Sequence, residues 1–140
     1  MKNKFSKGWK ASKSPRKQRK YIMGAPISIK KKLLGVNLSK ELRKKHGKRN
    51  ISARKDDVVK ILRGKFKNKR GKIVNVRTKM SRIEIEGIQV KKQDGSKVNV
   101  KLHPSNLQIV ELTLEDRKRN KNLKIKKEDI KTAKEVPKKE

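Results

Sequence analysis

The sequence contains no cysteine, which excludes disulfide bonds and thiolate metal sites and agrees with a reducing compartment. It also lacks any apolar run near the roughly 20 residues that a membrane-spanning helix requires. The first ten residues, MKNKFSKGWK, lack the apolar stretch of a secretory signal. We therefore expect a soluble, intracellular protein with no membrane partner.

Acidic residues are also scarce, because 13 Asp and Glu stand against 45 Lys and Arg, giving a formal net charge of +32 on 140 residues. Such a chain repels itself and requires a polyanionic partner, of which nucleic acid is the first candidate. Hydrophobic residues make up 31% and charged residues 41% of the sequence. This composition supplies one small core but not two, so we expect one domain with long arms.

The charge is unevenly distributed along the chain. Residues 1–55 hold 20 basic residues and a single acid, Glu41, whereas residues 56–112 hold 14 and 6, and residues 113–140 hold 11 and 6. We therefore predict a basic N-terminal extension over 1–55, a folded barrel over 56–112, and a short helix with a mobile basic tail over 113–140. The extension should be the main electrostatic contact, mobile until bound, and its removal should leave the barrel folded.

A short helix is predicted near the end of the extension. Ser39 is a suitable N-cap, Glu41 favours the first turn, Leu42 provides an apolar anchor and Gly47 ends the helix. Because isolated helices of this length are seldom stable in water, it should form by docking onto the barrel or onto RNA.

Two further segments of the extension carry weaker signals. The stretch APISIKKKLLG predicts a similar short helix, with Pro26 restricting its start and Gly35 ending it. Ahead of it, SPRKQRKYIMGAP is predicted to be an extended strip along a phosphate backbone, without regular secondary structure.

The central part of the chain alternates apolar and polar residues at period two, which predicts five or six half-buried strands. The apolar positions are Val59 and Ile61; Val74 and Val76; Ile83 and Ile85; Ile88 and Val90; Val98, Val100 and Leu102; and finally Leu107, Ile109 and Leu112. With no helical period among them, the fold class is mainly β, a small barrel whose edges are removed by closure.

Turn residues separate these strands. Asp94 and Gly95 predict a tight hairpin by supplying positive φ angles, and the His103-Pro104-Ser105-Asn106 cluster predicts a turn before the last strand. Gly71, directly before a β-branched run, is predicted to hold a backbone angle or a close packing that a Cβ would forbid. Gly64 begins the basic turn FKNKR that Gly71 ends.

The stretch from Asp57 to Gly87 resembles the KOW motif, and several flanking blocks extend the resemblance. Seven blocks are similar, in order, to the archaeal and eukaryotic form of the large-subunit ribosomal protein of universal family 24: SPRKQRK, LSKELRKKHGKR, ARKDD, the EG after Ile85, DGSKV, HPSN and LTLEDRKR. This resemblance covers roughly Pro15 to Arg119. It implies an SH3-like barrel that binds large-subunit ribosomal RNA early in assembly, on the cytoplasmic ribosome, near the exit of the nascent-peptide tunnel.

The sequence departs from the family pattern in two places. Asn68 and Lys69 stand where the family often has a smaller residue or glycine, which makes the loop more basic. The end from Asn120 onward is not recognisably part of the pattern, and we expect it to be frayed or disordered. Before it, Thr113 is a candidate cap for a short helix, with Asp116 at the reciprocal capping position.

Candidate RNA-binding residues are the basic side chains of the extension and of the barrel turns, together with a histidine and a serine of the HPSN block. They are Arg16, Lys17, Arg19, Lys20, Arg43, Lys44, Arg49, Arg54, Lys55, Arg63, Lys65, Lys67, Lys69, Arg70, Lys72, Arg77, Lys79, Arg82, His103 and Ser105. Lys and Arg neutralise phosphates and release counterions, so binding should depend steeply on salt. For any single lysine, the alternative to an RNA contact is an exposed side chain that is only solvated. The structural positions of the motif are Gly64, Gly71, Gly87, Asp94 and Gly95.

The four aromatic residues have two interpretations each. Phe5, Trp9 and Tyr21 could stack on unpaired bases or anchor in an apolar groove. Phe66, inside the basic turn, could pack against the barrel end or present its ring to RNA; we favour packing.

Catalysis is poorly supported. His46 and His103 have no acid, cysteine or second histidine at suitable spacing. The Asp56-Asp57 pair is interpreted as turn carboxylates paired with Arg54 or Lys55 rather than as a cation site. Glu84 and Glu86 share a strand face, with Arg82 and Lys91 as plausible partners.

We therefore predict a structural protein of the large ribosomal subunit and not an enzyme. Its partners should be large-subunit ribosomal RNA and neighbouring ribosomal proteins, with no cofactor, metal, small-molecule substrate or homo-oligomer. A KOW-type transcription or RNA-chaperone factor is the alternative. An RNA-processing enzyme would need an acid, base or metal set that the sequence lacks.

Overall fold

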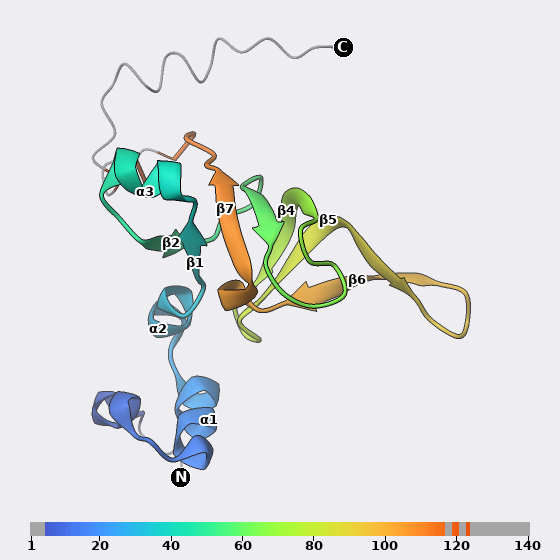
Figure 1. The fold of residues 1–140 in the computed structure, drawn as a ribbon. Coiled ribbons are helices and arrows are strands. Elements are labelled where there is room, and N and C mark those ends of the chain that lie inside the picture. The colour runs from blue at the N-terminus through green and yellow to red at the C-terminus, as the bar shows by residue number, and fades with distance from the viewer. Residues whose placement is uncertain (1–4, 117–118, 121–122, 124–140) are drawn as a thin grey trace.

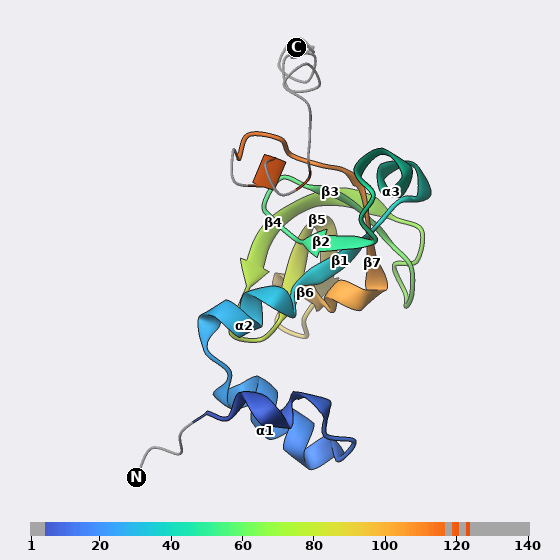
Figure 2. The ribbon, with the colours of Figure 1, turned by 90° about the vertical axis from the view of Figure 1, so that its left-hand side faces the viewer.

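The computed structural model describes residues 5–116, 119, 120 and 123. In chain order the elements are η1 (Lys7–Ala11), α1 (Pro15–Gly24), α2 (Ile27–Lys32), β1 (Gly35–Leu38), α3 (Lys40–His46), β2 (Asn50–Ser52), β3 (Val58–Ile61), β4 (Arg70–Arg77), β5 (Arg82–Lys91), β6 (Lys97–Leu102), η2 (Pro104–Asn106) and β7 (Leu107–Glu111). Seven strands form one curved sheet in the order β2-β1-β7-β3-β4-β5-β6 (Figures 1 and 2). The fold is therefore mainly β and barrel-like, as predicted.

The sheet curves around one apolar core. The core residues are Leu34, Val36, Leu38, Ala53, Val59, Ile61, Ile73, Ile83, Ile85, Ile88, Leu107 and Ile109. Most come from the inward positions of strands, where alternate residues share a face. Phe66 packs partly buried against this core, which confirms the packing interpretation of its ring.

A bulge in β4 changes which residues face the core. The pairing of β4 with β5 shifts between Ile73 and Asn75, so that Val74 is the extra residue. Ile73 is consequently buried, whereas Val74 is 46% exposed. The predicted alternation of Val74 with Val76 was wrong in this respect, because a bulge interrupts the period of two.

The two predicted strands around Ile85 and Ile88 are one long strand, β5. Gly87 has a φ of +72° and lies where the register of β5 against β6 shifts. This irregularity keeps Ile88 in the core, while Val90 beyond it is 48% exposed. Val90 is therefore not the core residue that the sequence predicted.

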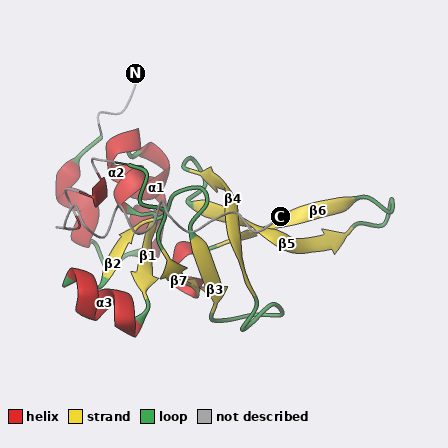
Figure 3. Ribbon diagram, turned by 90° about the horizontal axis from the view of Figure 1, so that it is seen from above, coloured by secondary structure: helices red, strands yellow, loops and turns green. Residues whose placement is uncertain are grey.

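The predicted hairpin joins β5 and β6, and it projects away from the rest of the sheet (Figure 3). The N–H of Gly95 donates to the carbonyl of Lys92, and the carboxylate of Asp94 accepts from the N–H and the hydroxyl of Ser96. Those hydrogen bonds lower the pKa of Asp94. Within the Asp94-Gly95 pair only the glycine has a positive φ, +81°, so the pair supplies one left-handed residue rather than two.

Strands β1 and β2 belong to the sheet although they lie in the predicted extension. β1 pairs antiparallel with β2 and parallel with β7, where Leu38 aligns with Ile109. Val36 and Leu38 are fully buried. Deleting residues 1–55 would therefore remove part of the core, which corrects the expectation that the barrel stays folded without them. The signal was missed because β1 is short and enters the sheet by pairing with a strand distant in sequence.

Helix α3 confirms the predicted helix and its caps. The hydroxyl of Ser39 accepts from the N–H of Leu42, and Gly47 ends the helix with a φ of +62°. Helix α2 is confirmed as well, with Pro26 as its N-cap, although Gly35 begins β1 instead of ending the helix.

Helix α1 corrects the prediction of an extended strip over this region. Pro15 occupies the first turn, where its missing N–H costs nothing, and the following Arg, Lys and Gln residues are good helix formers. The amide of Gln18 donates to the carbonyls of Lys10 and Ser12, which fixes η1 against α1. This small helical unit lies apart from the sheet and is joined to it through α2 (Figures 1 and 2).

A buried ion pair attaches the chain after β7 to the barrel. Both guanidinium nitrogens Nη1 and Nη2 of Arg119 contact the carboxylate of Asp57, at 2.6 and 2.7 Å. The carboxylate also accepts from the backbone N–H groups of Arg54 and Thr113. Asp57 is therefore held by Arg119, and not by the side chain of Arg54 or Lys55 as predicted.

The same segment corrects the prediction for the chain end. Residues 112–116 are not helical, so Thr113 does not cap a helix. Arg119, Asn120 and Leu123 are helical, and the N–H of Asn120 donates to the carbonyl of Asp116 at the i to i−4 spacing of an α-helix, so the described helical residues lie later than predicted. Arg119, Asn120 and Leu123 are buried, so fraying does not begin at Asn120. Residues 124–140, the remainder of the predicted tail, lie outside the described residues.

The ends of the strand order are β2 and β6, so the hydrogen-bonded ladder of the described residues is open between them. The predicted closure of the barrel edges is therefore incomplete. β2 is only three residues long, which limits the edge that it exposes.

Candidate nucleic-acid interface

The loop between β3 and β4 presents a cluster of basic side chains. It is fixed by hydrogen bonds from the N–H of Leu62 to the carbonyl of Asn106 and from the N–H of Lys67 to the carbonyl of Gly64. Gly64 and Asn68 both have positive φ, +90° and +68°. Asn is among the non-glycine residues that tolerate this conformation. Exposed basic side chains in or beside this loop are those of Arg63, Lys65, Lys67, Lys69, Arg70 and Lys72.

The turn between β4 and β5 carries the second predicted cluster. Lys79 is exposed at its tip, and Arg77 and Arg82 face each other across the two strands. Arg77 forms an ion pair with Glu84, which is buried. This pairing differs from the predicted partners Arg82 and Lys91, and it partly neutralises Arg77 before any phosphate approaches.

The Arg77–Glu84 pair predicts a pH dependence of stability. The hydrogen bond from Arg77 lowers the pKa of Glu84, against the opposing effect of burial. Because the folded-state pKa lies below the unfolded one, the stabilisation is complete above the unfolded value of about 4.3 and is lost as the pH falls through the folded value. We expect Glu84→Gln to flatten the acid side of the stability curve, measured by urea unfolding between neutral pH and pH values below this range. An unchanged acid slope would contradict this role.

His103 and Ser105 form the cap of η2. The Nδ1 of His103 accepts from the N–H of Ser105 and lies 2.7 Å from its hydroxyl. Burial lowers the pKa of His103, and Arg82 lowers it further. The lowered pKa favours the neutral ring, which suits an Nδ1 that accepts the hydrogen bond at the start of η2.

The predicted residues of the extension lie in separate places. Arg16, Lys17, Arg19 and Lys20 are exposed on α1, away from the sheet. On and after α3, Lys44 and Arg49 are exposed, but the Nε of Arg43 donates to the carbonyl of Leu38 and helps to hold the helix to β1.

A broad groove of about 910 Å³ joins the extension to the barrel. It lies between the end of α2, β2 and the segment after β7. Basic residues on its walls are Lys31, Lys32, Lys48, Arg54, Lys55 and Arg119, and acidic ones are Asp56, Glu115 and Asp116. Arg54 is paired with Asp116. Lys31, Lys32 and Lys48 were not among the predicted residues, although the run KKK at residues 30–32 was a visible signal.

In the described part of the chain, no group of three or more His, Asp or Glu side chains is placed to hold a metal ion. Nor does any helix of that part have the length and apolarity to cross a membrane.

Residues 12–126 match the model of the family described as ribosomal proteins L26 of eukaryotes and L24 of archaea. The chain belongs to the L26/L24 family. This confirms the resemblance found in the sequence and supports a structural role in the large ribosomal subunit, in translation. The family match favours this role over the alternative of a transcription or RNA-chaperone factor.

The L26/L24 match also corrects the extent of the resemblance. It runs to residue 126, so it includes Asn120 and Leu123, which we predicted to lie outside the family pattern. Their burial gives a physical reason, since the chain after β7 packs against the barrel through Arg119 and its neighbours.

Proposed function

We propose that this member of the L26/L24 family binds large-subunit ribosomal RNA through its basic extension and barrel loops, early in subunit assembly, at a mature position near the nascent-peptide tunnel exit. This proposal rests on the placement of exposed basic side chains around a barrel whose apolar residues are mostly buried. They lie on the β3–β4 loop, the β4–β5 turn, α1 and α3. RNA helices are recognised largely through phosphates, 2′-hydroxyls and shape, which separate basic projections can reach together.

The proposal distributes the contacts between two regions. Residues 5–33, which form η1, α1 and α2, contain ten basic residues and no acid, so this region has no internal counter-charge. The β3–β4 loop is held rigidly by its backbone hydrogen bonds and positions its lysines. Arg77 and Arg54, being paired with carboxylates, contribute less to phosphate binding than the exposed lysines of that loop.

Removal of residues 1–33 should test the extension without damaging the core, because the first buried strand begins at Gly35. The deletion removes 12 basic residues and no acid. We expect circular dichroism to show that the shortened protein remains folded. In sedimentation, it should dissociate from the large subunit during a high-salt wash in which the full-length protein stays bound. The salt dependence of RNA binding should also become shallower, by about 0.7 to 0.9 in the logarithmic slope for each lost phosphate contact.

Removal of residues 127–140 provides the control, because this segment lies beyond the family match and carries five basic and four acidic residues. It should leave association with the subunit unchanged. A full-length chain that fails to sediment with the large subunit would overturn the proposed function.

A further inference from the structure

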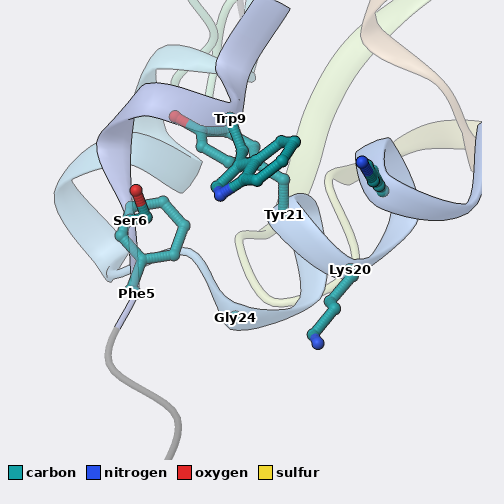
Figure 4. Close-up of a pocket in the computed structure, with 7 residues that line it drawn as sticks. Phe5, Ser6, Trp9, Lys20, Tyr21 and Gly24 are labelled. Atoms are coloured by element: carbon teal, nitrogen blue, oxygen red, sulfur yellow. The ribbon is translucent and has the colours of Figure 1, made fainter. Parts of the chain in front are cut away.

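The helical unit formed by η1 and α1 contains a cavity that none of the contacts proposed above uses. Its volume is about 420 Å³, and its lining includes the rings of Phe5, Trp9 and Tyr21 together with Lys17, Lys20 and Gly24. Figure 4 shows these aromatic side chains gathered where η1 approaches α1, with Lys20 nearby. Three of the four aromatic residues of the chain thus lie outside the barrel core.

The cavity has a defined geometry. The rings of Phe5 and Tyr21 pack against each other with centroids 4.9 Å apart and planes tilted by 46°. The two hydrogen bonds from Gln18 hold η1 in place against the helix. Trp9 is nevertheless 52% exposed, with the Nζ of Lys17 4.3 Å from its ring centroid. Lys17 lies over the Trp9 ring, and the half exposure of this ring beside two further aromatic rings leaves aromatic surface open to a ligand.

The charge around the cavity identifies the occupant. The surrounding residues 5–33 carry ten basic side chains and no acid. A polyanion with flat aromatic faces matches both the lysines and the rings, and a nucleobase stacks on aromatic side chains whatever its identity. We infer that this cavity accepts one unpaired base of RNA, stacked against Trp9, with Lys17 and Lys20 on the adjoining phosphates. The inference rests on the proposed function and specifies one of its contacts.

Trp9 is the only tryptophan of the chain, so its fluorescence reports on the cavity directly. The full-length protein is titrated with a short mixed-sequence single-stranded RNA, and separately with the same RNA annealed to its complement. Saturation is confirmed independently by electrophoretic mobility. We expect single-stranded RNA to quench Trp9 and the duplex to bind with little quenching. Emission that is unchanged at saturation with single-stranded RNA would overturn the inference.

Three variants separate stacking from folding. Trp9→Ala should weaken binding of the single-stranded RNA by roughly tenfold or more, with a smaller effect on the duplex. In Gly24→Leu the new Cβ meets only Phe5, at 3.8 Å, so the helix is preserved while the longer side chain fills the cavity. This variant should keep its helical circular dichroism and lose the quenching. Met23→Ala, which changes an 84% exposed residue of the same helix, should keep both.

The outcomes distinguish this inference from the proposed function. A protein that sediments with the large subunit but shows no quenching retains the function and loses the base-binding cavity. If Trp9→Ala weakens association with the subunit although free RNA never quenches the fluorescence, the cavity holds a neighbouring protein and the inference is wrong. A chain that does not sediment with the subunit fails the proposed function, whatever the oligonucleotides show.

Discussion

Substitution of Gly71 by valine is expected to destabilise the barrel by about 3 kcal/mol or more, a large part of the stability of a small domain. A Cβ at this position would lie 2.8 Å from the Cγ2 of Ile85 and 2.9 Å from the backbone carbonyl oxygen of Glu86. Ile85 is fully buried and the carbonyl belongs to β5, so neither atom can move away without disturbing the sheet. The measurement is urea unfolding followed by far-ultraviolet circular dichroism.

Gly35 provides the matched control, because it is also a strand glycine and its nearest non-neighbouring atom is 3.6 Å from the Cβ position. Gly35→Ala should leave stability unchanged or raise it by about 0.5 kcal/mol, through the lower entropy of the unfolded chain. Equal unfolding midpoints for Gly71→Val and the unmodified protein would show that the close approach of β4 and β5 is not required.

Replacement of Arg119 by alanine is expected to destabilise the protein by about 3–5 kcal/mol, because it leaves the carboxylate of Asp57 buried without its cation. Asp57 is fully buried and Arg119 is 4% exposed, so water does not readily replace the guanidinium. Two backbone N–H donors, from Arg54 and Thr113, would remain on the carboxylate. Urea unfolding again measures the change in free energy.

Arg54→Ala is the control for this prediction. It removes a half-exposed ion pair with Asp116 but keeps the backbone N–H that contacts Asp57. Its effect should be below about 1 kcal/mol. If Arg119→Ala unfolds at the same urea concentration as the unmodified protein, the segment after β7 is not held to the barrel by this ion pair.

Local patterns in the sequence predicted the features that depend on near neighbours. The capped helix α3, the hairpin at Gly95 and the turn at His103 each involve residues within a few positions of one another, and each is confirmed. The need for glycine at position 71 was also predicted, although only the structure identifies close packing rather than a backbone angle as its cause.

The features that were missed depend on contacts between residues far apart in the chain. β1 is a strand because Leu38 pairs with Ile109, and no local alternation of apolar and polar residues predicts this pairing. Similarly, Asp57 faces Arg119 across 62 positions of sequence. In the candidate interface, the basic residues could be predicted from composition. Arg54 and Arg77 differ from the exposed lysines of the β3–β4 loop because each is paired with a carboxylate. These ion pairs could not be read from the sequence and became visible only in the fold.

The parallel pairing of β1 with β7 has a consequence for the synthesis of this chain. Asn37 and Leu38 leave the translating ribosome about 70 residues before their partners Gln108 and Ile109. Until then β1 has only β2 as a neighbour in the sheet, and a two-stranded ribbon is marginal in water. The strongly basic first third of the protein is therefore exposed before the barrel can form.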